Sequence, residues 1–508
     1  MANVRPYLYY DHVVTLCEHE GCLRRIEGKY VIRDDGGNGE VWLHKWCPNH
    51  GASKVIIATD AKYWRQGREV YIKPPEMPLK FNTKMQWGCP YDCGLCPDHM
   101  QHSCLTILEV TDACNLACPV CYADSGPHRT THRDLATIER MLDAIVANEG
   151  EPDVVQISGG EPTIHPDFFA ILDAARRRPI RHLMVNTNGI RIANEPGFAA
   201  KLAAYAPRFE IYLQFDSFER DALIALRGAD LRQIRERAIA NLNAVGLSTT
   251  LVVTVAKGVN DAEIGKIIEY AARQPCVRGV TLQPIQFAGR TEGMTAKTSR
   301  LTLTGVRQMI LDQTALFCAA DIIPVPCNPD ALSMAYAIKT VEGTSQSIAP
   351  LTRYIGSEVL LAGDRNTIVF ESDANLKEQV FKLFATNLSP ESQASCLSDL
   401  MCCLPQVQAP SGITYDNVFR VLIMAFMDAV NFDVRAMKKS CVHIVQPDGK
   451  IIPFESFNLF YRDDRRDLLA LRRSEADVSF GRTKEAPAYP TTPIIATAAT
   501  KKMTTSDS

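Results

Sequence analysis

The stretch Thr111-Asp-Ala-Cys114-Asn-Leu-Ala-Cys118-Pro-Val-Cys121-Tyr122 decides what kind of protein this chain forms. Its cysteines stand at positions i, i+4 and i+7, so a single loop can bring all three thiols onto one metal centre. Three thiolates suit three irons of a 4Fe-4S cube and leave the fourth iron open, whereas a closed structural zinc site needs a fourth ligand. The spacing therefore predicts an iron–sulfur site with an open position for chemistry.

The segments around this loop alternate between strand and helix patterns. Residues 105–111, just before the loop, have the pattern of a strand, and residues 133–146, after it, have the apolar spacing of a helix. Further apolar strands are expected at residues 154–158, 182–186, 209–215, 249–255 and 279–284. Repeated strand–helix units favour a parallel sheet with right-handed crossovers, here curved into part of a TIM-type barrel over residues 105–330. Ligands are then expected at the carboxyl ends of the strands.

Polar motifs follow three of these strands. Ser158-Gly-Gly-Glu161-Pro162 comes directly after one strand; its glycines let the backbone approach a ligand, and Glu161 can accept hydrogen bonds from an ammonium group. The runs Asn186-Thr-Asn188-Gly189 and Gln214-Phe-Asp216-Ser217 supply amides and hydroxyls suited to a ribose or a carboxylate. Arg290, beyond the last strand, could meet a carboxylate or remain solvated.

Two further cysteine groups precede the barrel. In the first, two pairs of ligands predict a ribbon that holds a structural zinc or a rubredoxin-like iron: Cys17, Cys22, Cys47 and His50. Residues 30–33 and 40–43, joined by a Gly-rich turn, read as a hairpin in this ribbon. The second group predicts a fully ligated auxiliary 4Fe-4S cluster, with a second zinc site as the alternative: Cys89, Cys93, Cys96 and Cys104.

The cysteines beyond residue 326 allow three interpretations. They could form a third metal site, a substrate-binding set of thiols, or simply buried apolar residues: Cys327, Cys396, Cys402, Cys403 and Cys441. The last twenty or so residues are rich in Thr, Ala, Pro and Lys and read as a disordered tail.

Composition bounds the class of protein. The 508 residues are 46% hydrophobic and 22% charged, an ordinary balance for a globular enzyme of two or three domains. A net charge of -3 gives no electrostatic case for nucleic acid, and we find no apolar run long enough to span a membrane. The start lacks the apolar segment of a signal peptide, which predicts a cytoplasmic protein. In a reducing compartment, 17 cysteines favour metal ligation over disulfides.

The cysteine loop with its following tyrosine, together with Gly-Gly-Glu-Pro, resembles the signatures of the radical S-adenosylmethionine (SAM) enzymes. In that family the open iron chelates the amino and carboxylate groups of SAM, and one electron breaks a carbon–sulfur bond of SAM to release a carbon radical. The resemblance implies an α/β fold with a partial (βα)6 barrel, and a small-molecule substrate. It implies an electron donor such as flavodoxin or ferredoxin. It also implies SAM contacts from Tyr122, Gly159, Gly160, Glu161, Asn188, Gln214 and Asp216.

Nearly the whole chain is similar to the radical SAM family that contains tetraether lipid synthase and a pterin methylase. The shared order is an N-terminal ribbon, Trp-Gly-Cys-Pro-Tyr-Asp-Cys, the cysteine loop, Gly-Gly-Glu-Pro, Cys-Asn-Pro-Asp, and Cys441-Val-His-Ile-Val with Ile-Ile-Pro-Phe. Relatives often have a cysteine after this last motif, where Glu455 stands here. The order divides the chain into a metal ribbon (1–75), an auxiliary cluster segment (76–104), a barrel (105–330), a C-terminal cysteine-containing domain (331–485) and a tail (486–508).

Three functions are open at this point. The vicinal pair Cys402-Cys403 also resembles the radical SAM enzymes of arsinothricin biosynthesis, which favours transfer of the 3-amino-3-carboxypropyl group of SAM to thiol-bound arsenite. The alternative is carbon–carbon bond formation or methylation on a lipid chain or a pterin. A non-catalytic iron–sulfur electron carrier is the third, and the SAM motifs argue against it.

Overall fold

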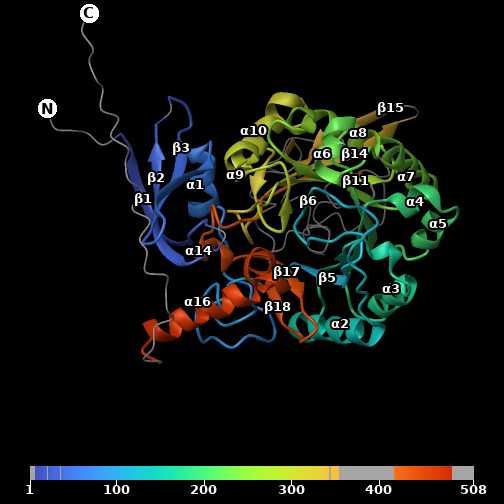
Figure 1. Cartoon of the computed structure of the whole chain (residues 1–508). Helices are drawn as coiled ribbons and strands as arrows, with labels where there is room; N and C mark the ends of the chain where they lie inside the picture. The colour runs from blue at the N-terminus through green and yellow to red at the C-terminus, as the bar shows by residue number, and fades with distance from the viewer. Residues whose placement is uncertain (1–5, 20, 35, 343–344, 354–416, 483–508) are drawn as a thin grey trace, which may run out of the picture.

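The computed structural model describes residues 6–19, 21–34, 36–342, 345–353 and 417–482. Figure 1 shows a small N-terminal sheet, in blue, beside a larger body in which helices surround a curved sheet. Every helix among the described residues is too short or too polar to cross a bilayer.

The N-terminal sheet is an antiparallel ribbon with its strands in chain order. The predicted hairpin is confirmed, since residues 25–33 and 40–47 pair across a turn whose Gly36 and Gly39 have φ of 82° and 79°. Such positive φ values favour glycine. A helix follows, and the Asp60 carboxylate caps it by accepting a hydrogen bond from the Tyr63 backbone N–H at 2.9 Å. The elements are β1 (Leu8–Leu16), β2 (Arg25–Arg33), β3 (Glu40–Cys47), β4 (Gly51–Ala58) and α1 (Ala61–Glu69).

The predicted barrel is confirmed as an α/β partial barrel. Six adjacent strands run parallel: β5 (Leu105–Thr111), β7 (Val154–Gly159), β8 (His182–Thr187), β9 (Phe209–Gln214), β10 (Thr249–Val255) and β11 (Val277–Pro284). Helices lie between them along the chain and pack on the outside of the sheet (Figure 1): α2 (Leu135–Glu149), α3 (Phe168–Arg176), α4 (Ile190–Asn194), α5 (Phe198–Ala203), α6 (Arg220–Arg227), α7 (Arg232–Val245) and α8 (Ile264–Arg273). Two more follow β11: α9 (Ala296–Ser299) and α10 (Leu303–Gln313).

Side chains alternate between the two faces of this sheet, as a pleated strand requires. In β7, Val155 and Ile157 are fully buried in the core formed with the outer helices. Gln156 instead lines a cavity inside the barrel. The polar residues of these otherwise apolar strands are therefore directed toward the interior of the barrel.

The C-terminal part of the chain does not form a sheet of its own. β16 (Val418–Met424) pairs parallel with β11, and β17 (Val442–Val445) pairs parallel with β5. The extension thus adds a strand to each edge of the six-stranded core, and the expected boundary at residue 330 does not separate two sheets. The remaining strands of this sheet are β13 (Ile323–Pro324), β14 (Leu332–Glu342), β15 (Ser345–Pro350) and β18 (Ile451–Pro453). The helices of the extension are α14 (Val434–Met437), α15 (Phe454–Ser456) and α16 (Arg466–Ser479).

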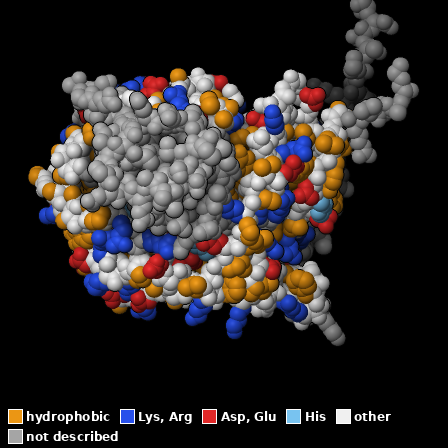
Figure 2. Space-filling model, turned by 180° about the vertical axis from the view of Figure 1, so that it is seen from behind, with side chains coloured by type: hydrophobic (Ala, Val, Ile, Leu, Met, Phe, Trp, Pro, Cys, Tyr) orange, Lys and Arg blue, Asp and Glu red, His pale blue; other side chains and the backbone are white. Residues whose placement is uncertain are grey.

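Residues 70–104, between α1 and β5, contain no helix or named strand; the part up to about residue 88 is mostly exposed, and most of residues 90–104 are buried. Several of their apolar side chains are exposed, including Leu79 at 77% and Val70 at 67%. On the face shown in Figure 2, basic and acidic side chains are interspersed and apolar ones gather toward the lower edge. The described residues of that face therefore form no continuous basic surface of the kind that nucleic acid requires.

A buried ion cluster joins the ribbon to the barrel. Arg68 of α1 donates to Asp330 Oδ1 at 2.6 Å and to Asp433 Oδ2 at 2.8 Å. Its guanidinium also lies over the rings of Tyr30 and Trp64, at 4.9 and 4.3 Å from their centroids. Because both carboxylates belong to the barrel body and are almost fully buried, one cation on the ribbon side neutralises two anions on the other side.

This arrangement predicts a large stability loss in Arg68→Ala. Removing the cation leaves two buried carboxylates facing each other, which should lower the free energy of unfolding by about 3–5 kcal/mol. Arg65→Ala is the matched control, because Arg65 is about half exposed and pairs only with Glu69 on the same helix. Its loss should cost under about 1 kcal/mol. Chemical denaturation of the two variants checks this, and equal effects would contradict the role of the cluster.

Candidate functional site

A cavity of about 130 Å³ opens at the carboxyl ends of the parallel strands. This is the end at which barrel enzymes hold their ligands. The cavity brings together residues from the cysteine loop and from the ends of three strands: Cys114, Cys118, Cys121, Tyr122, Gly159, Gly160, Asn188 and Gln214.

The cysteine loop is fixed by a short antiparallel pairing and by one arginine. β6 (Val120–Cys121) pairs with β12 (Arg290–Thr291). Arg290 donates to the carbonyl of Cys118 at 2.7 Å, to Asp124 Oδ1 at 2.8 Å and to the carbonyl of Ser125 at 2.7 Å. The guanidinium is therefore bound by the loop, a role that differs from both alternatives left open by the sequence, a ligand carboxylate and solvent.

Glu161 is buried and does not line the cavity. Oε1 accepts hydrogen bonds from the hydroxyls of Thr163 and Thr187 at 2.5 and 2.7 Å, and Oε2 accepts from the backbone N–H of Asn188 at 2.7 Å. Through these bonds the carboxylate holds the loop after β8 against the loop after β7. Its expected contact with a ligand ammonium group stays a prediction.

Asp216 is also buried away from the cavity. Arg227 of α6 binds it with two hydrogen bonds, of 2.7 and 2.6 Å. Burial alone would raise the pKa of Asp216, but the Arg227 cation holds that pKa below its usual range. Asp216 therefore forms a buried ion pair with Arg227, and its expected ligand contact stays a prediction.

Arg227 itself reaches the cavity wall and lies beside the thiols of Cys118 and Cys121. It places a positive charge next to sulfurs that become anionic when they bind metal. No local motif marks this residue, since it lies in the helix after β9 and meets the cysteine loop only in the folded chain.

The donor set fits an iron–sulfur cluster and SAM. The three thiols are free, lie on one loop beside the cavity and are half-buried or buried. Burial raises the pKa of Cys114 to about 12, so metal binding would have to displace its proton. Opposite the thiols, a Cβ on Gly159 or Gly160 would come within 2.2 or 2.1 Å of a backbone carbonyl oxygen. Only glycine fits at either position, because the backbone there packs directly against the start of the cysteine loop.

Deeper in the cavity, the strands supply carboxamides. Gln214 donates to Asn186 Oδ1 at 3.4 Å, and Asn186 donates to Ser158 Oγ at 3.2 Å. Gln283 donates to the hydroxyl of Tyr212 at 3.1 Å. Gln156 is 4% exposed and lines the cavity, and no group in the described parts of the chain hydrogen-bonds its carboxamide.

One wall of the cavity is aromatic. The rings of Tyr122 and Phe454 lie 4.9 Å apart in an edge-to-face arrangement, and those of Phe426 and Phe454 lie 4.1 Å apart. Arg462 lies over the Tyr122 ring and forms two hydrogen bonds, of 2.8 and 2.9 Å, with buried Glu109. Sequence reasoning missed Phe426, Phe454 and Arg462, because they come from the C-terminal extension.

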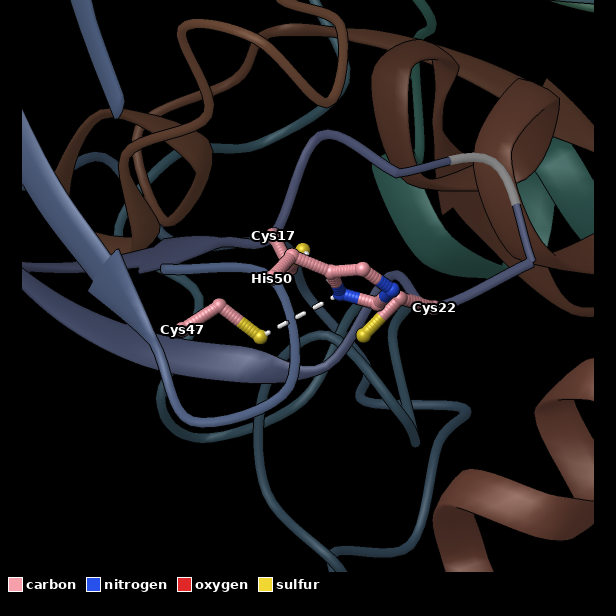
Figure 3. Close-up of side chains that lie close together, drawn as sticks. All are labelled: Cys17, Cys22, Cys47 and His50. Atoms are coloured by element: carbon pink, nitrogen blue, oxygen red, sulfur yellow. Dashed lines mark hydrogen bonds between the residues drawn. The ribbon is translucent and has the colours of Figure 1, made fainter. Parts of the chain in front are cut away.

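The ribbon ligands converge as predicted. The donor atoms of Cys17, Cys22, Cys47 and His50 all lie within 4.8 Å of one another. Figure 3 shows them facing one another between the ends of the ribbon strands, with His50 Nδ1 3.5 Å from the sulfur of Cys47. The same His50 nitrogen lies 3.4 Å from the sulfur of Cys17. Three thiols and one imidazole form a closed, four-ligand set of the kind that holds structural zinc.

The auxiliary group differs from the prediction. Cys89, Cys93 and Cys96 interact electrostatically, and the sulfur of Cys93 lies 3.2 Å from the hydroxyl of Ser456. Cys104, expected as their fourth ligand, instead lies with Cys327 and Cys441, and all three sulfurs are within 4.8 Å of one another. The reason is strand pairing: Cys104 precedes β5, Cys441 precedes β17, and these two strands are neighbours.

Two other sequence expectations concern the C-terminal part. Cys396, Cys402 and Cys403 lie outside the described residues, as does the expected tail. Glu455, at the position where relatives often have a cysteine, is buried and accepts a hydrogen bond from Ser440 Oγ at 2.8 Å. Burial raises the pKa of Glu455 to about 7.

Comparison with known proteins agrees with this geometry. The radical SAM superfamily matches residues 108–271, and the HMPTM N-terminal zinc ribbon domain matches residues 9–59. The chain is 28% identical over 491 residues to 7,8-dihydro-6-hydroxymethylpterin dimethyltransferase of Methanocaldococcus jannaschii, covering 89% of this chain and 95% of that protein.

Other relatives match over shorter ranges. GTP 3',8-cyclase of Alkaliphilus metalliredigens is 26% identical, over 53% of this chain and 78% of its own length. A solved structure of Streptococcus suis SuiB bound to the precursor peptide SuiA has a TM-score of 0.35 at 17% identity, over 41% of this chain and 44% of that one. On the family matches, the chain is an enzyme of the radical SAM superfamily with an N-terminal zinc ribbon.

Proposed function

We propose that the enzyme is a SAM-dependent transferase that forms a carbon–carbon bond, such as a methylation, on a planar nitrogen heterocycle of the pterin kind. The observation that carries this proposal is the carboxamide of Gln156, which lines the cavity and hydrogen-bonds no other described side chain. It offers a ligand both a donor and an acceptor.

The shape and chemistry of the cavity support a flat heterocycle. Tyr122, Phe426 and Phe454 form an aromatic wall on which a ring can stack. Gln156 and Gln283 offer amide groups that match the alternating donors and acceptors of a pteridine edge. The whole-chain similarity to a pterin dimethyltransferase points the same way.

The residues of the loop and strand ends would hold the cofactors. Cys114, Cys118 and Cys121 would bind a 4Fe-4S cluster, and the backbone of Gly159 and Gly160 would face SAM together with Asn188, Gln214 and Tyr122. When bound, the cluster would supply the electron that opens SAM to a carbon radical. Arg227 would balance the charge of the thiolates, and the aromatic wall would keep water from the reacting atoms.

Electron supply is also part of the proposal. Cys89, Cys93 and Cys96 would hold an auxiliary cluster, and an electron donor such as flavodoxin or ferredoxin would reduce the enzyme. Radical SAM enzymes need a reductant, and the open-iron chemistry cannot start without one.

The arsenite interpretation rests on Cys402 and Cys403, which lie outside the described residues. Cys327, another thiol considered for substrate binding, is buried with Cys104 and Cys441. The relatives found support the pterin alternative instead.

The deciding experiment analyses the fragments of SAM. The anaerobically reconstituted, reduced enzyme should form 5'-deoxyadenosine faster when 6-hydroxymethyl-7,8-dihydropterin is added, because a bound heterocycle gives the radical a hydrogen to take. Chromatography with and without the pterin measures this. Methylthioadenosine that appears only with arsenite would overturn the proposal. Absence of SAM binding would instead favour the hypothesis of a non-catalytic electron carrier.

Cys114→Ala, Cys118→Ala and Cys121→Ala should each reduce SAM cleavage to the background rate, since two thiolates cannot hold the cube. Cys276→Ala is the matched control, because Cys276 is 2% exposed and belongs to the core between sheet and helices. It should keep the wild-type rate. Full activity in any of the three loop variants would show that the cluster is held elsewhere.

Gln156→Leu should raise the KM for the pterin about tenfold or more, because a polar edge of the substrate then loses its partner. SAM affinity should be unchanged. Met184→Leu is the control: it is buried on the neighbouring strand and does not line the cavity. Steady-state kinetics and SAM titration separate the two effects, and an unchanged KM would exclude Gln156 from substrate recognition.

A further inference from the structure

Three thiols from distant parts of the chain meet beneath the cavity. Cys104, Cys327 and Cys441 are 0–1% exposed, and the sulfurs of Cys327 and Cys441 are 3.6 Å apart although 114 residues separate them. The three side chains belong to one apolar cluster that also contains Leu105 and Val442. We call this group the buried thiol triad.

The triad lies where the two ends of the curved sheet approach each other. Cys104 and Cys441 precede the paired strands β5 and β17, near one edge of the sheet. Cys327 follows β13, the edge strand at the other end of the sheet order. One group of ligands therefore connects elements that no strand pairing joins.

We infer that the buried thiol triad, with His102 as the fourth ligand, binds a single thiophilic ion such as zinc and closes the partial barrel. The site lies before the first residues of β5 and β17, at the amino ends of the parallel strands. In barrel enzymes this end contributes stability, whereas the carboxyl end carries the chemistry. The bound ion is structural and takes no part in the reaction.

The spacing of the sulfurs favours one ion over a cluster. Ligands that share one tetrahedral zinc lie about 3.8 Å apart, given zinc–sulfur bonds of about 2.3 Å. Thiolates on different irons of a cube stand farther apart, because the cube separates them. Among the described residues, only the ribbon ligands and the triad bring three or more donors within 4.8 Å of one another. The triad thus shares the compact geometry of the ribbon.

His102 has the environment of a metal-binding imidazole. Its Nε2 lies 3.6 Å from the sulfur of Cys104, and its Nδ1 lies 2.9 Å from Glu149 Oε2. Metal-binding histidines generally donate their second nitrogen to a carboxylate, which fixes the ring. His102 lies outside the group of three sulfurs that stand within 4.8 Å of one another, and its Nε2 is also 3.6 Å from Glu76 Oε2. The ring would therefore have to move toward the sulfurs of Cys327 and Cys441 to complete the site.

The binding energy would act on folding. Ligands from three distant segments are brought together only in the folded chain, so the free energy of metal binding adds to that of folding. The ion would hold β17 against β5 and would fix the loop after β13, below a cavity whose lining includes Leu105 and Val442.

Metal analysis of the full-length protein tests the inference. Protein from zinc-supplemented cells should contain two zinc ions per chain, one in the ribbon and one at the triad. Cys327→Ser should lose one zinc and keep its iron and sulfide, and it should unfold at a lower temperature. Cys276→Ser, which alters another buried cysteine, should keep both zinc ions.

A second measurement tests the inference even if Cys327→Ser does not fold. In Cys17→Ser, whose ribbon site is disabled, cobalt(II) should still give a thiolate-to-cobalt charge-transfer absorption from the triad. Absence of that band, or one zinc ion in the wild type, would overturn the inference. Loss of iron and sulfide from Cys327→Ser with zinc unchanged would also overturn it, because the triad would then hold a cluster.

Discussion

The close contact between the first two strand ends of the barrel is the constraint on which the site depends. The backbone N–H of Gly160 donates to the carbonyl of Thr111 at 2.8 Å, and that of Glu161 donates to the carbonyl of Ala113 at 2.9 Å. No side chain larger than hydrogen fits between these backbones. The contact sets the start of the cysteine loop against the loop after β7, so cluster ligands and SAM-facing backbone arrive at the same cavity wall.

The residues around this contact keep it in place. Glu161 joins the loops after β7 and β8, Asp216 holds Arg227 beside the thiols, and Arg290 fixes the far end of the cysteine loop. Each is a charged group buried with a partner of opposite charge or with hydrogen-bond donors or acceptors, as buried charges must be. The wall of the cavity is therefore rigid before any cofactor binds, and the cofactors meet preformed positions.

Local patterns predicted most of the fold and about half of the site. The strands of the barrel were recognisable because each is a short apolar run followed by a turn motif, and the cysteine loop because its ligands are close in sequence. Cys104 was assigned to the wrong group because its true neighbours depend on the pairing of β5 with β17, which no local pattern encodes. Local patterns also missed four residues that only the folded chain brings to the site: Arg227, Phe426, Phe454 and Arg462. Glu161 and Asp216 were recognised as important, but their partners, and therefore their roles, are visible only in the folded chain.

The pairing of β5 with β17 also has a consequence for the order of events during synthesis. β5 is the first strand of the barrel to leave the ribosome, yet its outer edge has no partner until the residues after Cys441 have emerged. Until then the nascent barrel exposes an unpaired strand edge, which is a site for aggregation. A chain truncated before residue 442 would therefore keep this edge of β5 unpaired and open to aggregation.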